Sequence, residues 1–416
     1  MEKLALYGGE KAKKTPYTKG QRFGDEELKE LKEALEQNTL FYWFGNKVKT
    51  LTEKFKDMYG MNYCVATSSG TSAIHTALGA LEITSGDEVI TTPLTDMGTI
   101  IGIICQNAIP VFADIDPYSY NITAKTIEKC ITEKTKAVIV VHLAGRSADM
   151  DEIVKLCKKH NLKLIEDCAQ AYLSRYKGKL AGTFGDAGCF SLNDFKQISA
   201  GDGGLVIMND EAVYKNALKY ADKNYNRLAT TVDEMRAVNF IGLNYRMNEL
   251  TGAVGIAQVN KLEQICKRRN EIGEKLNKAL SEIPCIIPPF PDSDDYCTYW
   301  FYLFRVDTSK IKTDMDTFVQ ALRAEGGSFA KGYITEPVYS YPLFKELTGY
   351  YNSHVPFNLP EYGKEISYPE GLCPVAEDVC KCTVKMGINE FMSDNDIDEL
   401  IECIRKVSEY FMKEQQ

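Results

Sequence analysis

The chain has 416 residues, of which 44% are hydrophobic and 26% charged, a composition typical of a protein whose buried core can enclose a pocket. Its net charge of −9 disfavours general nucleic-acid binding, which requires a basic surface that displaces counterions. No apolar run is long enough to cross a membrane, and the first residues lack the apolar core of a secretory signal, so we expect a cytoplasmic protein.

Thirteen cysteines are scattered through the sequence. Their number is odd, and no Cys-x-x-Cys pair occurs. The closest pair, Cys380 and Cys382, has neither a second pair nor neighbouring histidines to complete a four-ligand zinc site. We therefore expect reduced, buried thiols and no metal site.

The first predicted element is a helix over residues 25–37. Leu28, Leu31, Ala34 and Leu35 fall on one helical stripe, with glutamates and lysines opposite. This spacing predicts an amphipathic helix on the surface of the molecule.

Between residues 63 and 210, short β-rich runs alternate with helical segments such as 151–159. This alternation predicts an α/β fold whose mostly parallel sheet is covered by helices on both faces. The seven expected strands are 63–68, 88–94, 109–115, 137–143, 163–167, 187–192 and 204–208.

A smaller α+β domain is expected after this sheet, giving a division into residues 1–260 and 261–416. We interpret the proline-rich segment 286–291 as the junction that follows a long helix. The expected elements are a helix from Asn248 to about Leu280, a strand at 298–306, a helix at 313–325, a turn-rich loop at 326–374 and a closing helix near 394–413.

Three clusters of residues carry candidate chemistry, and the first is Ser-Ser-Gly-Thr-Ser at 68–72. It lies between an expected strand and an expected helix, where backbone N–H groups and hydroxyls converge on a point that suits a phosphate. A simple Ser/Thr helix cap is the alternative, and it is favoured when this cluster is considered alone.

The second cluster, residues 165–170, places Asp167 at the carboxyl end of an apolar strand, where open α/β sheets bind ligands. A carboxylate there can keep a pyridine nitrogen protonated, so that the ring accepts electrons from a carbanion. The alternative role for Asp167 is a helix N-cap.

The third cluster surrounds Lys196, which follows an expected buried strand and precedes the glycine-dense residues 201–204. Ser191, five residues upstream, could be a second phosphate ligand. A lysine that is partly desolvated beside another cation has a lowered pKa and becomes nucleophilic, as Schiff-base chemistry requires.

In this order, the three clusters resemble the DegT/DnrJ/EryC1/StrS family of sugar aminotransferases. The resemblance covers nearly the whole chain and extends to residues 86–90, 109–116, 142–151 and 244–250. It implies the fold of type I pyridoxal-phosphate-dependent transferases, with a seven-stranded sheet domain and a smaller C-terminal α+β domain.

The resemblance also implies a pyridoxal 5'-phosphate cofactor bound to Lys196 as a Schiff base. By the same resemblance, Asp167 should contact the pyridinium nitrogen and Gln170 should lie near the ring hydroxyl. Both Lys196 and Asp167 would then be catalytic residues.

For the cofactor phosphate, the resemblance implies Thr71, Ser72 and Ser191 as ligands. Asn244 matches a family asparagine that reaches the phosphate bound by the neighbouring subunit. We therefore expect a homodimer with shared active sites, the commonest form of soluble oligomer.

The sequence departs from the family pattern in residues 92–99. The family commonly places an aromatic side chain against the cofactor ring at the position that Asp96 occupies here, with an ambiguity of one residue toward Met97. Either the ring face is covered differently, or the pocket is adapted to an unusual substrate.

The resemblance predicts transfer of an amino group from glutamate or glutamine to a keto-sugar, with a nucleotide-linked sugar preferred. An inosose, another cyclitol or a free keto-sugar is an alternative acceptor. A pyridoxal-phosphate-dependent sugar dehydratase is a further alternative, although its deoxygenating relatives have histidine where this chain has Lys196. The last alternative is a non-catalytic cofactor-binding protein.

Overall fold

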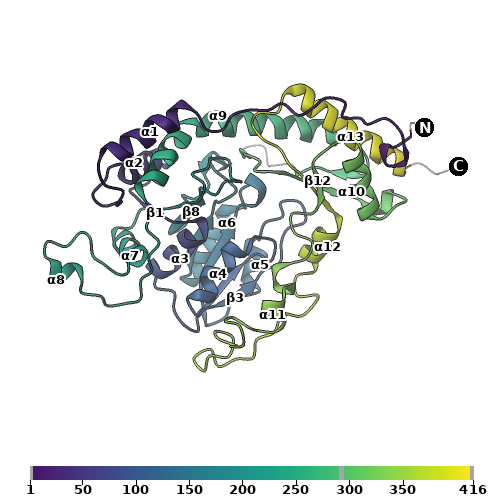
Figure 1. Cartoon of the computed structure of the whole chain (residues 1–416). Coiled ribbons are helices and arrows are strands. Elements are labelled where there is room, and N and C mark those ends of the chain that lie inside the picture. Colours follow the sequence, from purple (N-terminus) through teal and green to yellow (C-terminus); the bar gives the residue numbers. More distant parts are fainter. Residues whose placement is uncertain (1–2, 290–294, 413–416) are drawn as a thin grey trace.

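A seven-stranded sheet forms the centre of the computed structural model, which describes residues 3–289 and 295–412 (Figure 1). β9 runs antiparallel to both of its neighbours, and the other neighbouring pairs are parallel. The predicted mostly parallel α/β sheet is therefore confirmed. Its strands, in spatial order, are β1 (Tyr63–Thr67), β9 (Gly204–Met208), β8 (Ala187–Ser191), β5 (Lys163–Asp167), β4 (Thr135–Val141), β2 (Glu88–Thr91) and β3 (Ile109–Phe112).

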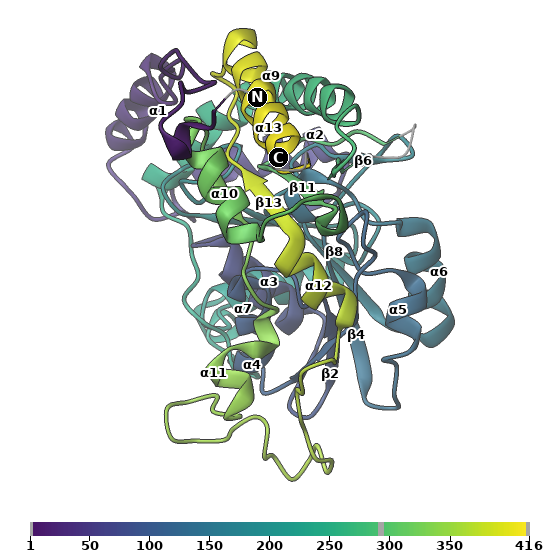
Figure 2. The same ribbon diagram turned by 90° about the vertical axis from the view of Figure 1, so that its right-hand side faces the viewer.

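Helices cover both faces of this sheet, which explains why β8 and β9 are buried at every position. α5 (Ala124–Glu128) and α6 (Met150–His160) pack together on one face (Figure 2). The opposite face carries α3 (Gly70–Ala80), α4 (Met97–Cys105) and α7 (Glu211–Ala221). Because β1, β2, β5 and β8 run in the same direction, the loops that follow them meet at one edge.

The longest helix, α9 (Glu249–Leu280), passes along the outside of the large sheet (Figure 1). Its first half packs with α1 (Asp25–Glu36) and α2 (Lys47–Tyr59), and its second half packs with α13 (Asp394–Met412). Because α9 crosses residue 260 without a break, it belongs to both parts of the predicted two-domain division, and that division stays a prediction.

The helix predicted at residues 25–37 forms as α1, but its leucine stripe is largely in solvent. Ala34 is buried, whereas Leu28 and Leu35 are 64% and 62% exposed. Leu28 and Leu31 line a shallow apolar hollow together with Phe23. The amphipathic helix therefore presents an uncovered apolar surface to solvent.

A second, antiparallel sheet lies beside the second half of α9. Its two inner strands face α10 and α13, and the N-terminal residue Leu4 shares their core. The elements of this region are β10 (Ile286–Ile287), β11 (Tyr302–Val306), β13 (Thr383–Met386) and β12 (Phe329–Lys331), with α10 (Met315–Ala324), α11 (Pro342–Lys345) and α12 (Pro374–Cys382). The expected strand at 298–306, helix at 313–325 and closing helix are present, whereas β12 and β13 were not predicted.

Two smaller features complete the described chain. A short hairpin consists of β6 (Arg175–Tyr176) and β7 (Lys179–Leu180). The segment 222–248, which contains α8 (Val232–Met235), extends away from the body of the molecule (Figure 1). Among the described residues, none of the helices combines the length and the apolar character needed to span a bilayer.

Candidate active site

The three sequence clusters meet in one cavity of about 320 Å³ at the carboxyl ends of β5 and β8. The structure brings five of the predicted residues to its wall, namely Thr71, Asp167, Gln170, Ser191 and Lys196. Ser72 lies behind this wall in α3, and Asn244 lies outside it in the extended segment 222–248. The cavity therefore unites residues that are more than a hundred positions apart in the sequence.

Lys196 lies in the loop after β8 with its ammonium nitrogen 3.6 Å from the centre of the Trp300 ring. Burial lowers the pKa of Lys196 to about 8, although the carboxylates of Asp167 and Asp96 oppose the shift. A substantial fraction of this amine is therefore neutral, and hence nucleophilic, near pH 8.

The loop that carries Lys196 is held from two sides. The guanidinium group of Arg22 donates hydrogen bonds to the carbonyl oxygens of Asp194 and Lys196. From the other side, the indole N–H of Trp300 donates to the carbonyl oxygen of Phe195 at 2.5 Å. These contacts fix the backbone on both sides of the amine.

Asp167 is buried at the end of β5, and burial raises its pKa. The Thr99 hydroxyl donates to its Oδ2 at 2.8 Å, and the Ala169 N–H donates to its Oδ1 at 3.1 Å. Among the described residues, no cation forms an ion pair with this carboxylate. An oriented, buried carboxylate without a cation suits a protonated ring nitrogen.

The start of α3 forms the opposite end of the cavity. The Ser69 side chain caps the helix by accepting the Ser72 N–H at 3.0 Å, and Ser72 Oγ accepts the Ser69 N–H at 2.8 Å. A Cβ on Gly70 would lie 2.6 Å from Ser191 Cβ, so the glycine allows the helix start to approach β8. The backbone N–H groups of Gly70 and Thr71 in the first turn of α3, with the hydroxyls of Thr71 and Ser191, suit a phosphate.

Ser72 therefore serves as part of the helix cap, which was the alternative interpretation of the first cluster. Its hydroxyl also donates to the Ser69 carbonyl oxygen at 2.8 Å, and its side chain is buried. Its assignment as a direct phosphate ligand stays a prediction.

Asp96 stands in the cavity wall and is the N-cap of α4, where its Oδ1 accepts the Gly98 N–H at 2.7 Å. The aromatic side chains that reach the cavity wall here include Trp300 and Tyr333, which come from the smaller sheet region. Gln170 connects the two regions, because its Nε2 donates to the Tyr333 hydroxyl at 3.2 Å.

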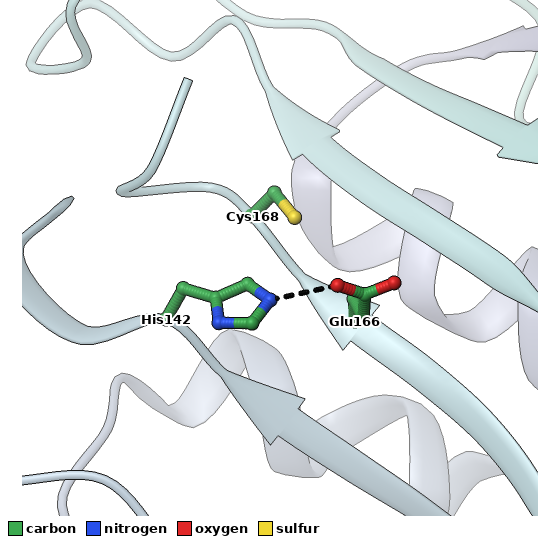
Figure 3. A group of neighbouring side chains, drawn as sticks. All are labelled: His142, Glu166 and Cys168. Atoms are coloured by element: carbon green, nitrogen blue, oxygen red, sulfur yellow. Dashed lines mark hydrogen bonds and ion pairs between the residues drawn. The ribbon is translucent and has the colours of Figure 1, made fainter. Parts of the chain in front are cut away.

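His142, Glu166 and Cys168 form a buried group whose side chains lie close together (Figure 3). Glu166 and Cys168 are the chain neighbours of Asp167. The His142 Nδ1 accepts the Ala148 N–H at 3.1 Å, so its Nε2 donates to Glu166 at 3.0 Å. Three backbone N–H groups of residues 182–185 also donate to Glu166, at 2.7 to 2.8 Å. Burial raises the pKa of the Cys168 thiol far above its usual range.

These contacts give the His142–Glu166–Cys168 group a supporting role. Both ring nitrogens of His142 and both carboxylate oxygens of Glu166 are already hydrogen-bonded. Cys168 would have to be a thiolate to bind a metal, and its raised pKa disfavours that form. The network instead ties β4, β5 and the loop before β8 together next to Asp167.

Thr99, Trp300 and Tyr333 line or support the site but were not predicted from the sequence. The position of Thr99 was recognisable, because it closes the loop after β2 at the same edge as Asp167. No local pattern marks Trp300 or Tyr333, which reach the cavity through the packing of the smaller sheet.

Comparison with known proteins agrees with this geometry. Residues 21–358 match the DegT/DnrJ/EryC1/StrS aminotransferase family. The chain belongs to this family. It is accordingly an aminotransferase, and the enzyme class predicted from the sequence is confirmed.

Relatives of this aminotransferase share about a third of its residues. The spore coat polysaccharide biosynthesis protein SpsC of Bacillus subtilis is 33% identical over 389 residues, which cover 92% of this chain and 95% of SpsC. A GDP-perosamine synthase of Escherichia coli is 34% identical over 303 residues, covering 73% of this chain and 80% of that protein. A protein of Streptoalloteichus tenebrarius, provisionally named an L-glutamine:3-amino-2,3-dideoxy-scyllo-inosose aminotransferase, is 32% identical and covers 97% of each chain.

Solved structures confirm the predicted fold class. An aminotransferase from Psychrobacter cryohalolentis superposes with a TM-score of 0.85 and 26% identity, covering 96% of this chain and all of that one. A 3-amino-5-hydroxybenzoic acid synthase has the same fold, with a TM-score of 0.82 over 95% of this chain and 99% of its own.

Proposed function

We propose that this aminotransferase uses pyridoxal 5'-phosphate to move an amino group from glutamate or glutamine to a keto-sugar, with a nucleotide-linked sugar as the preferred acceptor. One observation carries the proposal. The buried carboxylate of Asp167, the amine of Lys196 and the N-terminus of α3 line the same cavity. Ring nitrogen, aldehyde and phosphate of the cofactor each have a matching group there.

When bound, the cofactor supplies an aldehyde that exchanges amines and a pyridine ring that takes up the electrons released at the donor's α-carbon. Lys196 Nζ would hold the aldehyde until the donor's nitrogen displaces it. The freed amine, with its lowered pKa, would then take the proton from the donor's α-carbon and give it to the cofactor carbon that bore the aldehyde. In the second half of the cycle it would carry a proton from that carbon to the former keto carbon of the acceptor.

Asp167 would keep the ring nitrogen protonated through both halves of the cycle. Thr99 and Ala169 orient its two oxygens, and the His142–Glu166–Cys168 group holds the strand behind it. Trp300 and Tyr333 give the cavity an aromatic wall on the side of the smaller sheet.

The names of the relatives support two classes of acceptor. GDP-perosamine is a nucleotide-linked amino sugar, which favours a nucleotide-linked keto-sugar here. The relative provisionally named for an inosose favours a keto-cyclitol and glutamine as the donor, and it covers more of this chain. The cyclitol is therefore the second candidate acceptor.

We also propose that the enzyme works as a homodimer with shared sites. Asn244 is exposed in the segment 222–248, where Val238 and Ile241 are 55% and 83% exposed. The apolar hollow on α1 offers a further surface for a second copy. All thirteen cysteines are free thiols, as expected in the reducing cytoplasm that we propose as its location.

Absorbance spectroscopy tests the core of this proposal. Purified protein is mixed with pyridoxal 5'-phosphate, and its visible spectrum is recorded before and after adding glutamate or glutamine, with Lys196→Ala as the control. A cofactor band that shifts with the donor in the wild type but not in the variant is the expected result. A wild-type protein that binds the cofactor and reacts with neither donor would contradict the proposed reaction.

The acceptor is then identified with the aminated form of the cofactor. A nucleotide-linked keto-sugar should restore the original band more rapidly than scyllo-inosose at equal concentration. The reverse order would assign the enzyme to cyclitols.

A further inference from the structure

Lys385 is a cation of β13 whose ammonium group lies against two aromatic rings. Its Nζ is 5.0 Å from the centre of the Phe301 ring and 5.7 Å from that of Tyr333. The side chain is partly buried, and burial lowers its pKa. Within residues 3–289 and 295–412, no carboxylate forms an ion pair with this ammonium group.

These rings continue into the wall of the active-site cavity. Tyr333 lines the cavity and stacks on Phe301 at 5.0 Å, while its edge meets Trp300 at 6.1 Å. Trp300 also contacts the amine of Lys196, which lies 3.6 Å from the ring centre. Lys196 and Lys385 are therefore two cations on one continuous aromatic wall.

An ammonium group that is partly removed from water needs either a counter-ion or a ligand. The aromatic faces hold the Lys385 nitrogen in place, but they do not neutralise its charge. The three carboxylates in the cavity wall already have partners. Asp96 caps α4, Asp167 accepts the Thr99 hydroxyl, and Asp202 accepts the Asn193 side-chain N–H at 3.1 Å. An anionic group of a substrate would supply the counter-charge that Lys385 lacks among the described residues.

We propose that Lys385 binds the α-carboxylate of the amino donor. The inference deepens the proposed function and rests on it, because it concerns the donor of that reaction. Lys385 contacts Tyr333, and Tyr333 in turn contacts the Trp300 ring over which the Lys196 amine lies. The charge of Lys385 also lowers the pKa of Lys196, so a group bound by Lys385 lies close to the reacting amine. In an amino acid, the carboxylate is attached to the same carbon as the transferred nitrogen. The phosphates of a nucleotide-linked sugar are separated from the keto carbon by several ring atoms.

The test compares donors that keep or lack this carboxylate. Lys385→Met keeps much of the side-chain length without the charge, and Lys385→Arg keeps the charge. Lys331→Met is the matched control, since Lys331 lies on the adjacent strand β12 and is ion-paired with Asp316 at 2.9 Å. The donor is titrated in the spectroscopic half-reaction, and its decarboxylated analogue, γ-aminobutyramide for glutamine or γ-aminobutyrate for glutamate, is titrated as its competitor.

We expect Lys385→Met to raise the apparent dissociation constant of the donor roughly 10- to 100-fold, the usual cost of losing a charged hydrogen bond. The analogue should bind all variants equally, because it has no α-carboxylate. Lys385→Arg should restore most of the donor's affinity, and Lys331→Met should behave as wild type. The spectrum of the bound cofactor should be the same in every variant, which shows that the site is intact.

Two results would overturn the inference. One is an equal change for the donor and its analogue in Lys385→Met, or no change for either. The other is unchanged donor affinity together with weakened binding of a nucleotide-linked acceptor, which would assign Lys385 to the acceptor's phosphates. Failure of the wild type to react with either donor would instead contradict the proposed function itself.

Discussion

At the scale of single residues, the proposed role of Asp167 requires a negative charge that its burial disfavours. Burial raises the pKa of this carboxyl, so the ionised form is less stable in the cavity than in water. The hydroxyl of Thr99 opposes this effect by donating to the carboxylate. Thr99 therefore offsets part of the cost of holding a negative charge at Asp167.

Asp167→Asn tests whether the buried charge costs stability and supports activity. The amide keeps the shape of the side chain and removes the buried charge, so we expect unfolding temperatures equal to or above the wild type. The half-reaction with the donor should slow by about 100-fold or more, in line with the loss of one preorganised electrostatic contact. Thermal unfolding and stopped-flow absorbance measure the two effects. A variant that is unstable but fully active would contradict this assignment.

The pH dependence of Lys196 follows from the charges around it. Its pKa is lowered to about 8 by burial, so the neutral amine predominates above that pH and is lost below it. We expect the rate at which cofactor-free protein captures pyridoxal 5'-phosphate to rise with pH and to level off above about 8.

Two substitutions should move this midpoint in opposite directions. Lys385 lowers the pKa of Lys196 by charge repulsion and Asp96 raises it by attraction. Lys385→Met should therefore shift the midpoint to higher pH. Asp96→Asn should shift it to lower pH, and asparagine retains the N-cap of α4. Shifts of both variants in the same direction would show that these charges do not act on Lys196.

At the scale of elements, the close approach of α3 to β8 shapes the phosphate end of the cavity. Gly70→Ala would place a methyl group 2.6 Å from Ser191 Cβ, which forces the helix start away from the strand. We expect destabilisation of about 1–3 kcal/mol and cofactor affinity reduced at least about 10-fold. Gly387→Ala is the control, because its added methyl group would make only ordinary contacts with the Ser328 side chain, at 3.4 Å from Oγ and 3.9 Å from Cβ.

Fluorescence titration with the cofactor and thermal unfolding of both variants measure the predicted difference. Gly387→Ala should match the wild type in both measurements. Normal cofactor affinity in Gly70→Ala would mean that the helix start tolerates displacement and that the phosphate is held elsewhere.

The strands of the large sheet were predictable because each is a buried apolar run bounded by turn residues. β8 and β9, for example, occur within a residue of their expected limits. In the smaller sheet, β12 has only three residues, and β13 follows α12 without an intervening turn. Neither is therefore an apolar run bounded by turn residues. The leucines of α1 were correctly placed on one face of the helix. Local spacing, however, does not show whether that face packs against the rest of the same chain or stays exposed.

The residues of the candidate site also fall into a group that was predictable from the sequence and a group that was not. Asp167, Ser191 and Lys196 each follow a predicted strand, so the direction of the sheet alone brings them together. Trp300 and Tyr333 belong to the smaller sheet region and reach the cavity only through tertiary packing. Short-range sequence patterns do not show that Trp300 and Tyr333 form one side of the cavity. Lys385 contacts Tyr333 through the same tertiary packing, so it was not predicted either.

At the scale of the whole molecule, the position of Asn244 outside its own cavity predicts that two chains build each site. Lys196→Ala and Asn244→Asp should both be inactive as homodimers, the second because its carboxylate repels the cofactor phosphate. Each site would take Lys196 from one subunit and Asn244 from the other. In a mixed dimer, one site would therefore contain both substitutions and the other would contain neither.

Mixing the two inactive variants therefore tests the shared site directly. If subunits reassort at random, half of the dimers are mixed and each contains one intact site, so activity should recover to about a quarter of the wild-type value. Mixing either variant with itself under the same conditions is the control. If Asn244 served its own subunit, each site of a mixed dimer would contain one lesion, and mixing would restore no activity.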